Sequence, residues 1–271
     1  MKKALLIITS LFSLVLTINA SQFVNLTPMP KNITMAEGAY KLPESYSINA
    51  KHLPDSICVE AEKFVQAILK TTGCKARITS KKKADIEMYL DTNLPNEGYK
   101  LSVTKNKIQI SASTTSGFFY AFQTIKKIMP AHVMAGLNPE QAQAIIPTYQ
   151  TDKRPTIPCV EIYDEPRFWY RGFMLDCGRH FFTVDEIKHI LDGMAIYKLN
   201  YFHWHLTEDQ GWRFEVKKYP RLTSIGSVAS DCRMNDMEKG YYWLGKPYGP
   251  YFYTHEDCKE IVEYARNLHI E

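Results

Sequence analysis

The six cysteines of this sequence include no Cys-x-x-Cys pair, a spacing typical of zinc sites and redox motifs, so neither is expected. The chain also has no long low-complexity tract, and its 45% hydrophobic and 13% aromatic content is typical of a globular protein. The net charge is only +4 and comes in part from Lys2 and Lys3, so no nucleic-acid partner is expected. The run Lys81–Lys83 is interpreted as a solvated turn.

The cysteines show no spacing that would select disulfide partners, although an exported protein can form disulfides. Cys58 and Cys258 fall on apolar faces of predicted helices. Because a free thiol behaves as a small apolar group, we expect most of the cysteines to be buried thiols. The six positions are 58, 74, 159, 177, 232 and 258.

No membrane span is expected, because crossing a bilayer takes about 20 apolar residues and the apolar stretch Ala4–Leu16 is too short. This stretch follows the basic pair Lys2-Lys3 and precedes Ala20, a small residue suited to cleavage. The pattern predicts a secretory signal peptide at residues 1–20. The mature chain is therefore expected to hold about 251 residues (271 − 20) and to be exported, either to the periplasm or by secretion.

The sequence pattern of residues 21–155 predicts a small α+β domain with both helices and strands. The expected elements are helices at about 56–72 and 115–129 and strands at 76–78, 86–90, 99–104 and 107–111, with strand-like residues also between 25 and 50. In the second helix Phe118, Phe119 and Phe122 are interpreted as core residues, because they fall on an apolar helical stripe.

Prolines spaced between residues 147 and 166 give an extended segment, and the domain boundary is expected there, with the second domain starting at residue 156. Beyond this segment strands alternate with helices. Thr183 and Glu186 predict a capping box at the start of one helix, and a later helix is expected to start at Thr254.

The second domain begins as a β-α-β unit in which ionisable residues follow each strand. The apolar run Phe173–Leu175 ends in Asp176, and the run Tyr201–Leu206 is followed closely by Glu208 and Asp209. Sites in parallel α/β folds are built at the carboxyl ends of the strands. We therefore expect the functional residues at this edge.

A (β/α)8 barrel takes about 250 residues, whereas residues 166–271 supply two strands, two helices and the start of a third strand at 269–271. The expected fold class is thus an α+β N-terminal domain (21–155) followed by the start of a (β/α)8 TIM barrel (156–271), incomplete in this sequence. The long segment 211–253 is expected to form a loop over the site.

Arg179 lies just past the first of these strands. Its guanidinium offers up to five donors in a rigid fork, which suits paired sugar hydroxyls or a carboxylate. An ion pair with Asp176 or Glu208 that holds the loop is an equal alternative. Glu208 and its neighbour Asp209 point in opposite directions on an extended chain, so one is expected to face the pocket while the other braces the loop.

His203 and His205 are two residues apart on a strand and so share one face. Such a pair can hold a metal at a barrel strand end, as in an amidohydrolase type of barrel, which would make the chain a metal-dependent hydrolase. That site needs further ligands, and His180 and His255 have no ligand-like spacing. The favoured interpretation is that both histidines are hydrogen-bonded residues, with no metal and no cofactor.

Two longer motifs indicate a protein family more specifically than any of their single residues does. They are Leu175-Asp-Cys-Gly-Arg-His-Phe181 and Lys198-Leu-Asn-Tyr-Phe-His-Trp-His-Leu-Thr-Glu-Asp-Gln-Gly-Trp-Arg-Phe-Glu-Val-Lys-Lys-Tyr-Pro-Arg-Leu222. From about residue 160 onward the chain closely resembles the exo-β-N-acetylhexosaminidases of glycoside hydrolase family 20. Residues 22–155 look like the N-terminal α+β domain of that family.

The resemblance implies removal of terminal β-linked N-acetylglucosamine or N-acetylgalactosamine from a glycan or chitooligosaccharide-like substrate. It implies a retaining, substrate-assisted mechanism, in which the acetamido oxygen of the sugar attacks the anomeric carbon. Arg179 matches the arginine that grips the ring hydroxyls, and Glu208 occupies a position where many members have aspartate. Asp176, His205 and Asp209 match positions that hold the pocket.

The family's catalytic Asp-Glu pair stands in a Gly-Gly-Asp-Glu type of motif, which is absent here. The expectation from the sequence is therefore an N-terminal portion of such an enzyme, with no catalytic residue of its own and inactive as given. A truncated product that binds sugars without cleaving them is the alternative.

Overall fold

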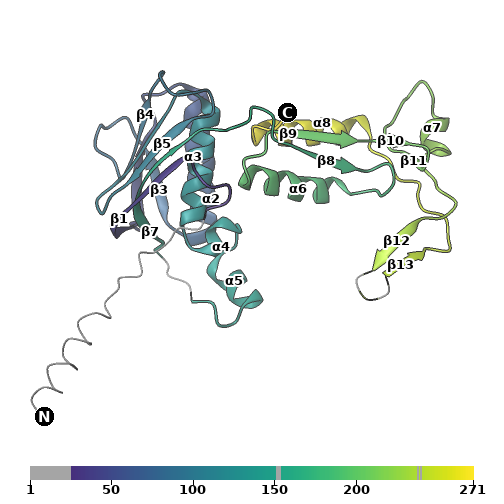
Figure 1. The fold of residues 1–271 in the computed structure, drawn as a ribbon, viewed down its shortest axis with the longest axis horizontal. Helices are drawn as coiled ribbons and strands as arrows, with labels where there is room; N and C mark the ends of the chain where they lie inside the picture. The colour runs from purple at the N-terminus through teal and green to yellow at the C-terminus, as the bar shows by residue number, and fades with distance from the viewer. Residues whose placement is uncertain (1–25, 151–153, 237, 239) are drawn as a thin grey trace, which may run out of the picture. The chain divides into compact units, whose positions relative to one another are not determined.

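The computed structural model describes residues 26–150, 154–236, 238 and 240–271, so the expected signal peptide at 1–20 lies outside the described residues. The chain divides into two compact units, Met1–Glu165 and Pro166–Glu271 (Figure 1). Within the described ranges, no helix is long and apolar enough to cross a membrane.

The first unit is built around a seven-stranded mixed sheet with the order β1-β7-β5-β6-β4-β2-β3. Its strands are β1 (Asn32–Lys41), β2 (Ser45–Asn49), β3 (Lys75–Ile78), β4 (Ile86–Leu90), β5 (Tyr99–Val103), β6 (Ile108–Ala112) and β7 (Thr156–Asp164). The pairs from β1 to β6 in this order are antiparallel, and the pairs from β6 to β3 are parallel.

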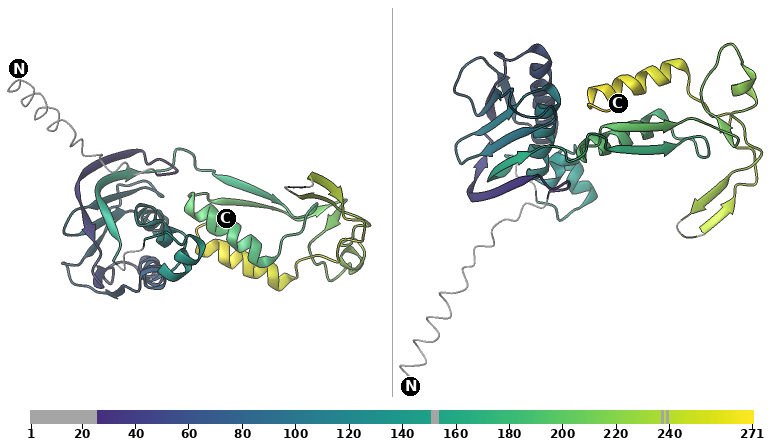
Figure 2. Two further views of the ribbon diagram at one scale, coloured as in Figure 1. Left: turned by 90° about the horizontal axis from the view of Figure 1, so that it is seen from below. Right: turned by 45° about the horizontal axis from the view of Figure 1, so that its top comes forward.

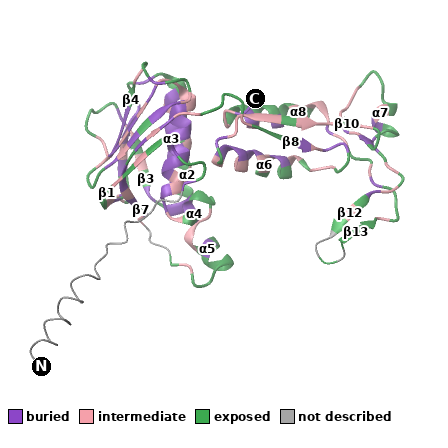
Figure 3. Ribbon diagram, viewed as in Figure 1, coloured by how far each residue is buried: buried purple, intermediate pink, exposed green. Residues whose placement is uncertain are grey.

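Two long helices, α2 (Asp55–Thr72) and α3 (Thr115–Ile128), lie side by side against one face of this sheet (Figure 2). Phe64 of α2 stacks on Phe122 of α3, with ring centroids 4.5 Å apart. Ten of the 14 residues of α3 are buried (Figure 3). The interpretation of its aromatic residues as core is confirmed.

Two shorter helices, α4 (Ala131–Met134) and α5 (Pro139–Ile145), were not expected from the sequence. The start of α5 carries a capping box between Asn138 and Gln141. That pair is a sequence signal for a helix start and could have predicted α5.

The boundary between the units falls later than the expected position at 155/156. Residues 156–164 form β7, which lies between β1 and β5 in the sheet of the first unit. Pro158, which suggested a linker, pairs with Ala39 at the point where the register of β1 shifts. Proline lacks a backbone donor and is tolerated in strands at such irregularities, so it did not prevent a strand here.

The second unit contains the predicted β-α-β unit, formed by β8 (Gly172–Asp176), α6 (Val184–Ile196) and β9 (Tyr201–His205). The two strands are parallel and in register from Gly172 opposite Tyr201 to Asp176 opposite His205. The helix α8 (His255–Asn267) packs beside α6. Capping boxes start α6 at Thr183, as predicted, and α8 at Thr254.

The core of this unit is small and lies between the two strands and the two helices. Its buried residues are Leu175, Cys177, Ile187, Leu191, Met194, Tyr253, Ile261, Ala265 and Ile270. Figure 3 shows β8 as largely exposed, in line with the exposure of Phe173 and Met174. The described residues form one parallel pair of strands here, and the expected barrel is not seen beyond it.

The segment 211–253 is more ordered than the expected loop. It holds β11 (Gly211–Trp212), which pairs with β10 (Thr207–Glu208), the short helix α7 (Arg221–Ser224), and a separate hairpin of β12 (Arg233–Asp236) and β13 (Gly240–Trp243).

Candidate functional site

The candidate site lies where β8 and β9 end together. Asp176 and His205 are opposite each other in the last pair of the parallel register. Just beyond them, the backbone N–H of Cys177 donates to the His205 carbonyl at 2.9 Å. Parallel pairing therefore brings the two predicted motifs to one edge, as expected from the sequence.

Arg179 occupies the turn after β8 and contacts both neighbouring carboxylates. Its Nη1 donates to Asp176 Oδ2 at 2.5 Å, its Nη2 lies 2.9 Å from Glu208 Oε1, and its backbone N–H donates to Asp176 Oδ1 at 3.1 Å. The Arg179 side chain is still 55% exposed. Because two ion pairs use only two of five N–H donors, the guanidinium keeps donors for a ligand.

These contacts hold the charges of the site in place. Partial burial raises the pKa of Asp176, but hydrogen bonds from the Arg179 side chain and backbone outweigh it and lower the pKa below its ordinary value. The hydrogen bond to Asp176 in turn raises the pKa of Arg179. Asp176 is thus held as an anion, which suits a residue that positions Arg179 rather than one that donates a proton.

Glu208 can approach this turn because residue 178 is a glycine. A Cβ atom built on Gly178 would lie 3.0 Å from both Cβ and Cγ of Glu208 and 3.4 Å from Asp176 Oδ1. A side chain at this position would press on the carboxylate that holds Arg179. The glycine in the Asp-Cys-Gly-Arg motif is thereby explained by close packing.

The adjacent acids Glu208 and Asp209 have separate surroundings. Glu208 lies in β10 and faces Arg179, whereas Asp209 lies in the two-residue turn between β10 and β11 and is exposed. Asp209 still contributes to raising the pKa of Arg179 through its charge. Only Glu208 contacts Arg179 directly, and the expectation that one acid faces a pocket while the other braces the loop stays a prediction.

His205 differs from the expectation of a hydrogen-bonded histidine, whereas the expectation for His203 stays a prediction. His205 Nε2 is buried and lies 3.0 Å from Glu208 Oε1 without making a hydrogen bond. His203 is exposed, and the two rings are 6.2 Å apart. Over the described ranges, no group of three or more His, Cys, Asp or Glu side chains could hold a metal ion.

Sequence reasoning missed Arg213, whose side chain is fully buried. Its guanidinium donates to the carbonyls of Cys177 and Gly178, at 3.1 and 3.0 Å, on the turn that carries Arg179. It also donates to the carbonyls of Ser227 and Tyr251, at 2.8 and 3.0 Å. Arg213 therefore links the turn that carries Arg179 to Ser227 and Tyr251 in the segment 211–253 through hydrogen bonds.

The glycine at 211 makes room for this buried guanidinium. A Cβ atom on Gly211 would lie 2.3 Å from Arg213 Cζ. The Gly-Trp-Arg sequence was the available signal for Arg213, because a glycine two residues before an arginine allows the side chain to fold back over the backbone.

An aromatic cluster packs beside the site turn. Phe181 stacks on Tyr253 with ring centroids 4.7 Å apart, and its backbone N–H donates to the Tyr248 hydroxyl at 3.0 Å. The Tyr253 hydroxyl donates to the Phe182 carbonyl. The cluster joins the turn after β8 to the end of the segment 211–253.

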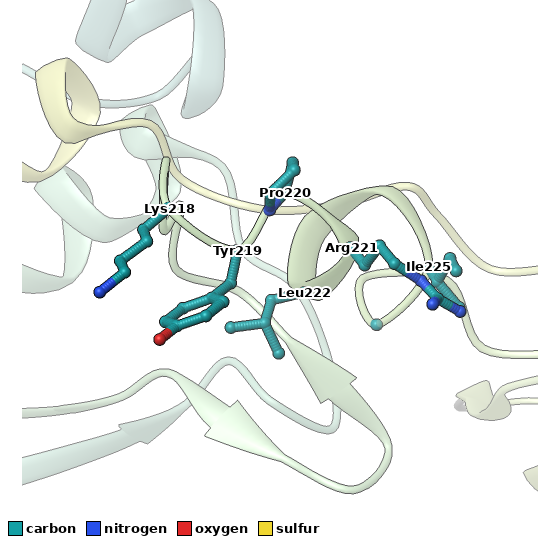
Figure 4. A pocket seen from close by; sticks show the side chains of 7 residues that line it. Lys218, Tyr219, Pro220, Arg221, Leu222 and Ile225 are labelled. Atoms are coloured by element: carbon teal, nitrogen blue, oxygen red, sulfur yellow. The ribbon is translucent and has the colours of Figure 1, made fainter.

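A separate pocket of about 660 Å³ lies at the start of α7 (Figure 4). It is lined by Lys218, Tyr219, Pro220, Arg221, Leu222, Ile225 and Gly226. None of the five expected site residues lines it. The candidate site is therefore the open edge around Arg179, not this pocket.

Sequence and structure comparisons agree on the family of this chain. The model of glycosyl hydrolase family 20, domain 2, matches residues 24–165, and that of the family's catalytic domain matches residues 168–271. A beta-hexosaminidase of Porphyromonas gingivalis is 36% identical over 260 residues, covering 91% of this chain and 29% of the relative.

Two solved structures are similar to the chain. A Streptomyces plicatus N-acetyl-beta-hexosaminidase matches with a TM-score of 0.74 and 28% identity, over 91% of this chain and 44% of its own. An exo beta-N-acetylglucosaminidase of Vibrio harveyi, in complex with N-acetylglucosamine, matches with a TM-score of 0.72 and 28% identity, over 90% of this chain and 35% of its own. This chain thus spans less than half the length of these relatives, and it belongs to glycoside hydrolase family 20.

Proposed function

We propose that the enzyme containing this chain is an exo-β-N-acetylhexosaminidase, which hydrolyses terminal β-linked N-acetylglucosamine or N-acetylgalactosamine from glycans. The observation that carries the proposal is the half-exposed Arg179 fork, held by Asp176 and Glu208 at the carboxyl edge of two parallel strands. The similarity to named hexosaminidases supports it. Export is proposed from the sequence pattern of residues 1–20 alone.

In this proposal the residues of the chain bind and orient the terminal sugar. The remaining N–H donors of Arg179 face neighbouring ring hydroxyls, and Glu208 accepts a hydrogen bond from one of them while keeping Arg179 in place. Asp176 holds Arg179 through a hydrogen bond, and the His205 ring packs next to the Glu208 carboxylate. Fixing the ring holds its acetamido group for attack on the anomeric carbon with retention of configuration.

We further propose that β8 and β9 are the first two strands of a (β/α)8 barrel. The backbone of Glu271 donates to the Asn200 carbonyl at 2.9 Å and accepts from Phe202 N–H at 2.7 Å. Bonds to the two residues that flank Tyr201 are the pattern of a parallel neighbour. This supports a third strand that includes Glu271, although His269 lies in the turn that ends α8 and not in the strand predicted at residues 269–271.

The 271-residue chain on its own is expected to bind the sugar without cleaving it. Both carboxylates at the site are paired with Arg179, and hydrogen bonds from Arg179 lower the pKa of Asp176, so neither is placed as a proton donor. General acid catalysis supplies about 10²–10⁴-fold in rate. The measurement is nitrophenol release from a nitrophenyl N-acetylglucosaminide, and appreciable release by the pure chain would contradict this part of the proposal.

Chelator treatment of the complete enzyme is expected to leave its activity unchanged. The proposed nucleophile comes from the substrate, so no metal-bound water is needed at that step. The control is a zinc hydrolase treated in parallel, which loses activity. If this enzyme also lost activity and zinc restored it, the metal-dependent hydrolase using His203 and His205 would replace the proposed function.

A further inference from the structure

The β12–β13 hairpin carries large aromatic side chains and stands apart from the other strands of the second unit. As far as the structure describes the chain, the two strands pair with each other and with no third strand. Tyr241, Tyr242 and Trp243 follow one another along β13 and are 69%, 40% and 67% exposed. A lone two-stranded hairpin is marginally stable, and exposed apolar groups on such an element mark a binding surface.

Tyr241 and Trp243 share one side of the hairpin, because successive residues of a strand point to opposite faces. The register places Asn235 opposite Tyr241 and Arg233 opposite Trp243, so all four residues belong to the same side. The Arg233 guanidinium lies 4.6 Å from the centroid of the Tyr241 ring. This side, the aromatic face, therefore presents two aromatic residues whose backbone positions are roughly 6.8 Å apart along the strand, beside an amide and a guanidinium.

Such a face suits a carbohydrate better than a protein partner. A pyranose ring has an apolar C–H face, which packs on the electron-rich face of an aromatic ring, and its hydroxyls accept from Arg and Asn side chains. Stable protein interfaces bury about 1,200–2,000 Å², which is more than one side of two short strands offers.

The segments on both sides of the hairpin contact the turn that carries Arg179. Before β12, Cys232 Sγ lies 4.0 Å from the carbonyl oxygen of Arg179. After β13, the Tyr248 hydroxyl accepts from the backbone N–H of Phe181 at 3.0 Å. The hairpin thus projects from the candidate sugar site, beyond the carboxyl ends of β8 and β9 (Figure 1).

The base of the hairpin is closed by Asp231. Its Oδ1 accepts from the backbone N–H groups of Cys232 and Gly245, at 2.8 and 2.9 Å, and Leu244 N–H donates to the Cys232 carbonyl at 2.9 Å. These bonds hold the two ends of the hairpin together at its base.

We propose that the aromatic face binds the sugar units of the substrate glycan that lie beyond the second one, counted from the terminal N-acetylhexosamine. This inference rests on the proposed function, because Arg179 must hold the terminal sugar for the next units to extend along the hairpin. It assigns the complete enzyme a preference for longer chains over disaccharides.

The test compares the complete enzyme with the double variant Tyr241→Ala/Trp243→Ala on chitobiose and on chitopentaose. We expect kcat/KM for the five-sugar chain to fall about tenfold in the variant, the size of a lost aromatic anchor, and to change less than about twofold for the two-sugar chain. Tyr242→Ala, on the opposite side of β13, is the matched control and should leave both substrates unchanged. A Tyr241→Phe/Trp243→Phe variant, which keeps the rings, should recover most of the loss.

Equal losses on both substrates, or no loss on either, would overturn the aromatic face as a binding surface. Titration calorimetry with chitopentaose separates this inference from the proposed function. If the unaltered enzyme cleaves neither substrate, the proposed function fails. In that case the aromatic face is still supported as a binding surface only if chitopentaose binds and the double variant weakens that binding about tenfold. An unaltered enzyme that binds no chitopentaose would overturn both.

Discussion

Replacing Arg179 with lysine in the complete enzyme is expected to lower kcat/KM for an N-acetylglucosaminide by about ten- to a hundred-fold. Lysine keeps the charge but loses the planar fork, so it cannot contact Asp176, Glu208 and a pair of sugar hydroxyls together. Each charge-assisted hydrogen bond is worth roughly 1.5–3 kcal/mol. A tilted ring would also misplace the acetamido group, so kcat should fall as well as kcat/KM.

The competing interpretation is that Arg179 only braces the turn through its two carboxylate partners. A thermal melt of the same variant distinguishes the two, because a brace predicts a kinetic loss that follows the loss of stability. Arg167→Lys is the matched control, since Arg167 is exposed and precedes β8. Near-normal kinetics for Arg179→Lys, or a loss fully matched by a lower melting temperature, would remove Arg179 from the proposed sugar contacts.

Replacing Arg213 with methionine is expected to destabilise the second unit by about 3–5 kcal/mol. Methionine fills similar space but donates no hydrogen bonds, so the carbonyls of Cys177, Gly178, Ser227 and Tyr251 lose their donor. Burial lowers the pKa of Arg213, which reflects the cost of burying its charge. Because that cost disappears in the variant, the net loss is smaller than four separate hydrogen bonds would suggest.

The measurement is thermal and urea unfolding of the Arg213 variants, followed by a signal from the tryptophans, all of which lie in the second unit. Arg213→Lys should fall between the wild type and methionine, since an ammonium group offers three donors. Arg266→Met, an exposed arginine on α8, is the control and should change stability by less than about 0.5 kcal/mol. A methionine variant as stable as that control would show that Arg213 is not a structural anchor.

The elements with a clear local pattern could be predicted from the sequence. β4 was expected at the residues where it lies, and α6 begins at the capping box of Thr183 and Glu186. The strand-end position of Arg179 followed from two apolar runs with a helix between them, because parallel pairing brings their ends together.

The features that depend on distant residues could not be predicted in the same way. β7 contains a proline and pairs with β1, more than a hundred residues earlier, so its membership of the first unit depends on a sheet that is invisible locally. The buried position of Arg213 likewise depends on carbonyls from three separate segments. The preceding Gly211 was the one local signal, and it does not identify those carbonyls.

All six cysteines lie in the described part of the chain, and each is a free thiol. Burial raises the pKa of Cys177 and Cys232, and that of Cys258 to about 11, so these sulfurs stay protonated near neutral pH. Oxidation and thiol exchange proceed through the thiolate. The described fold therefore contains no covalent cross-link between its cysteines, and its stability comes from packing, hydrogen bonds and ion pairs alone.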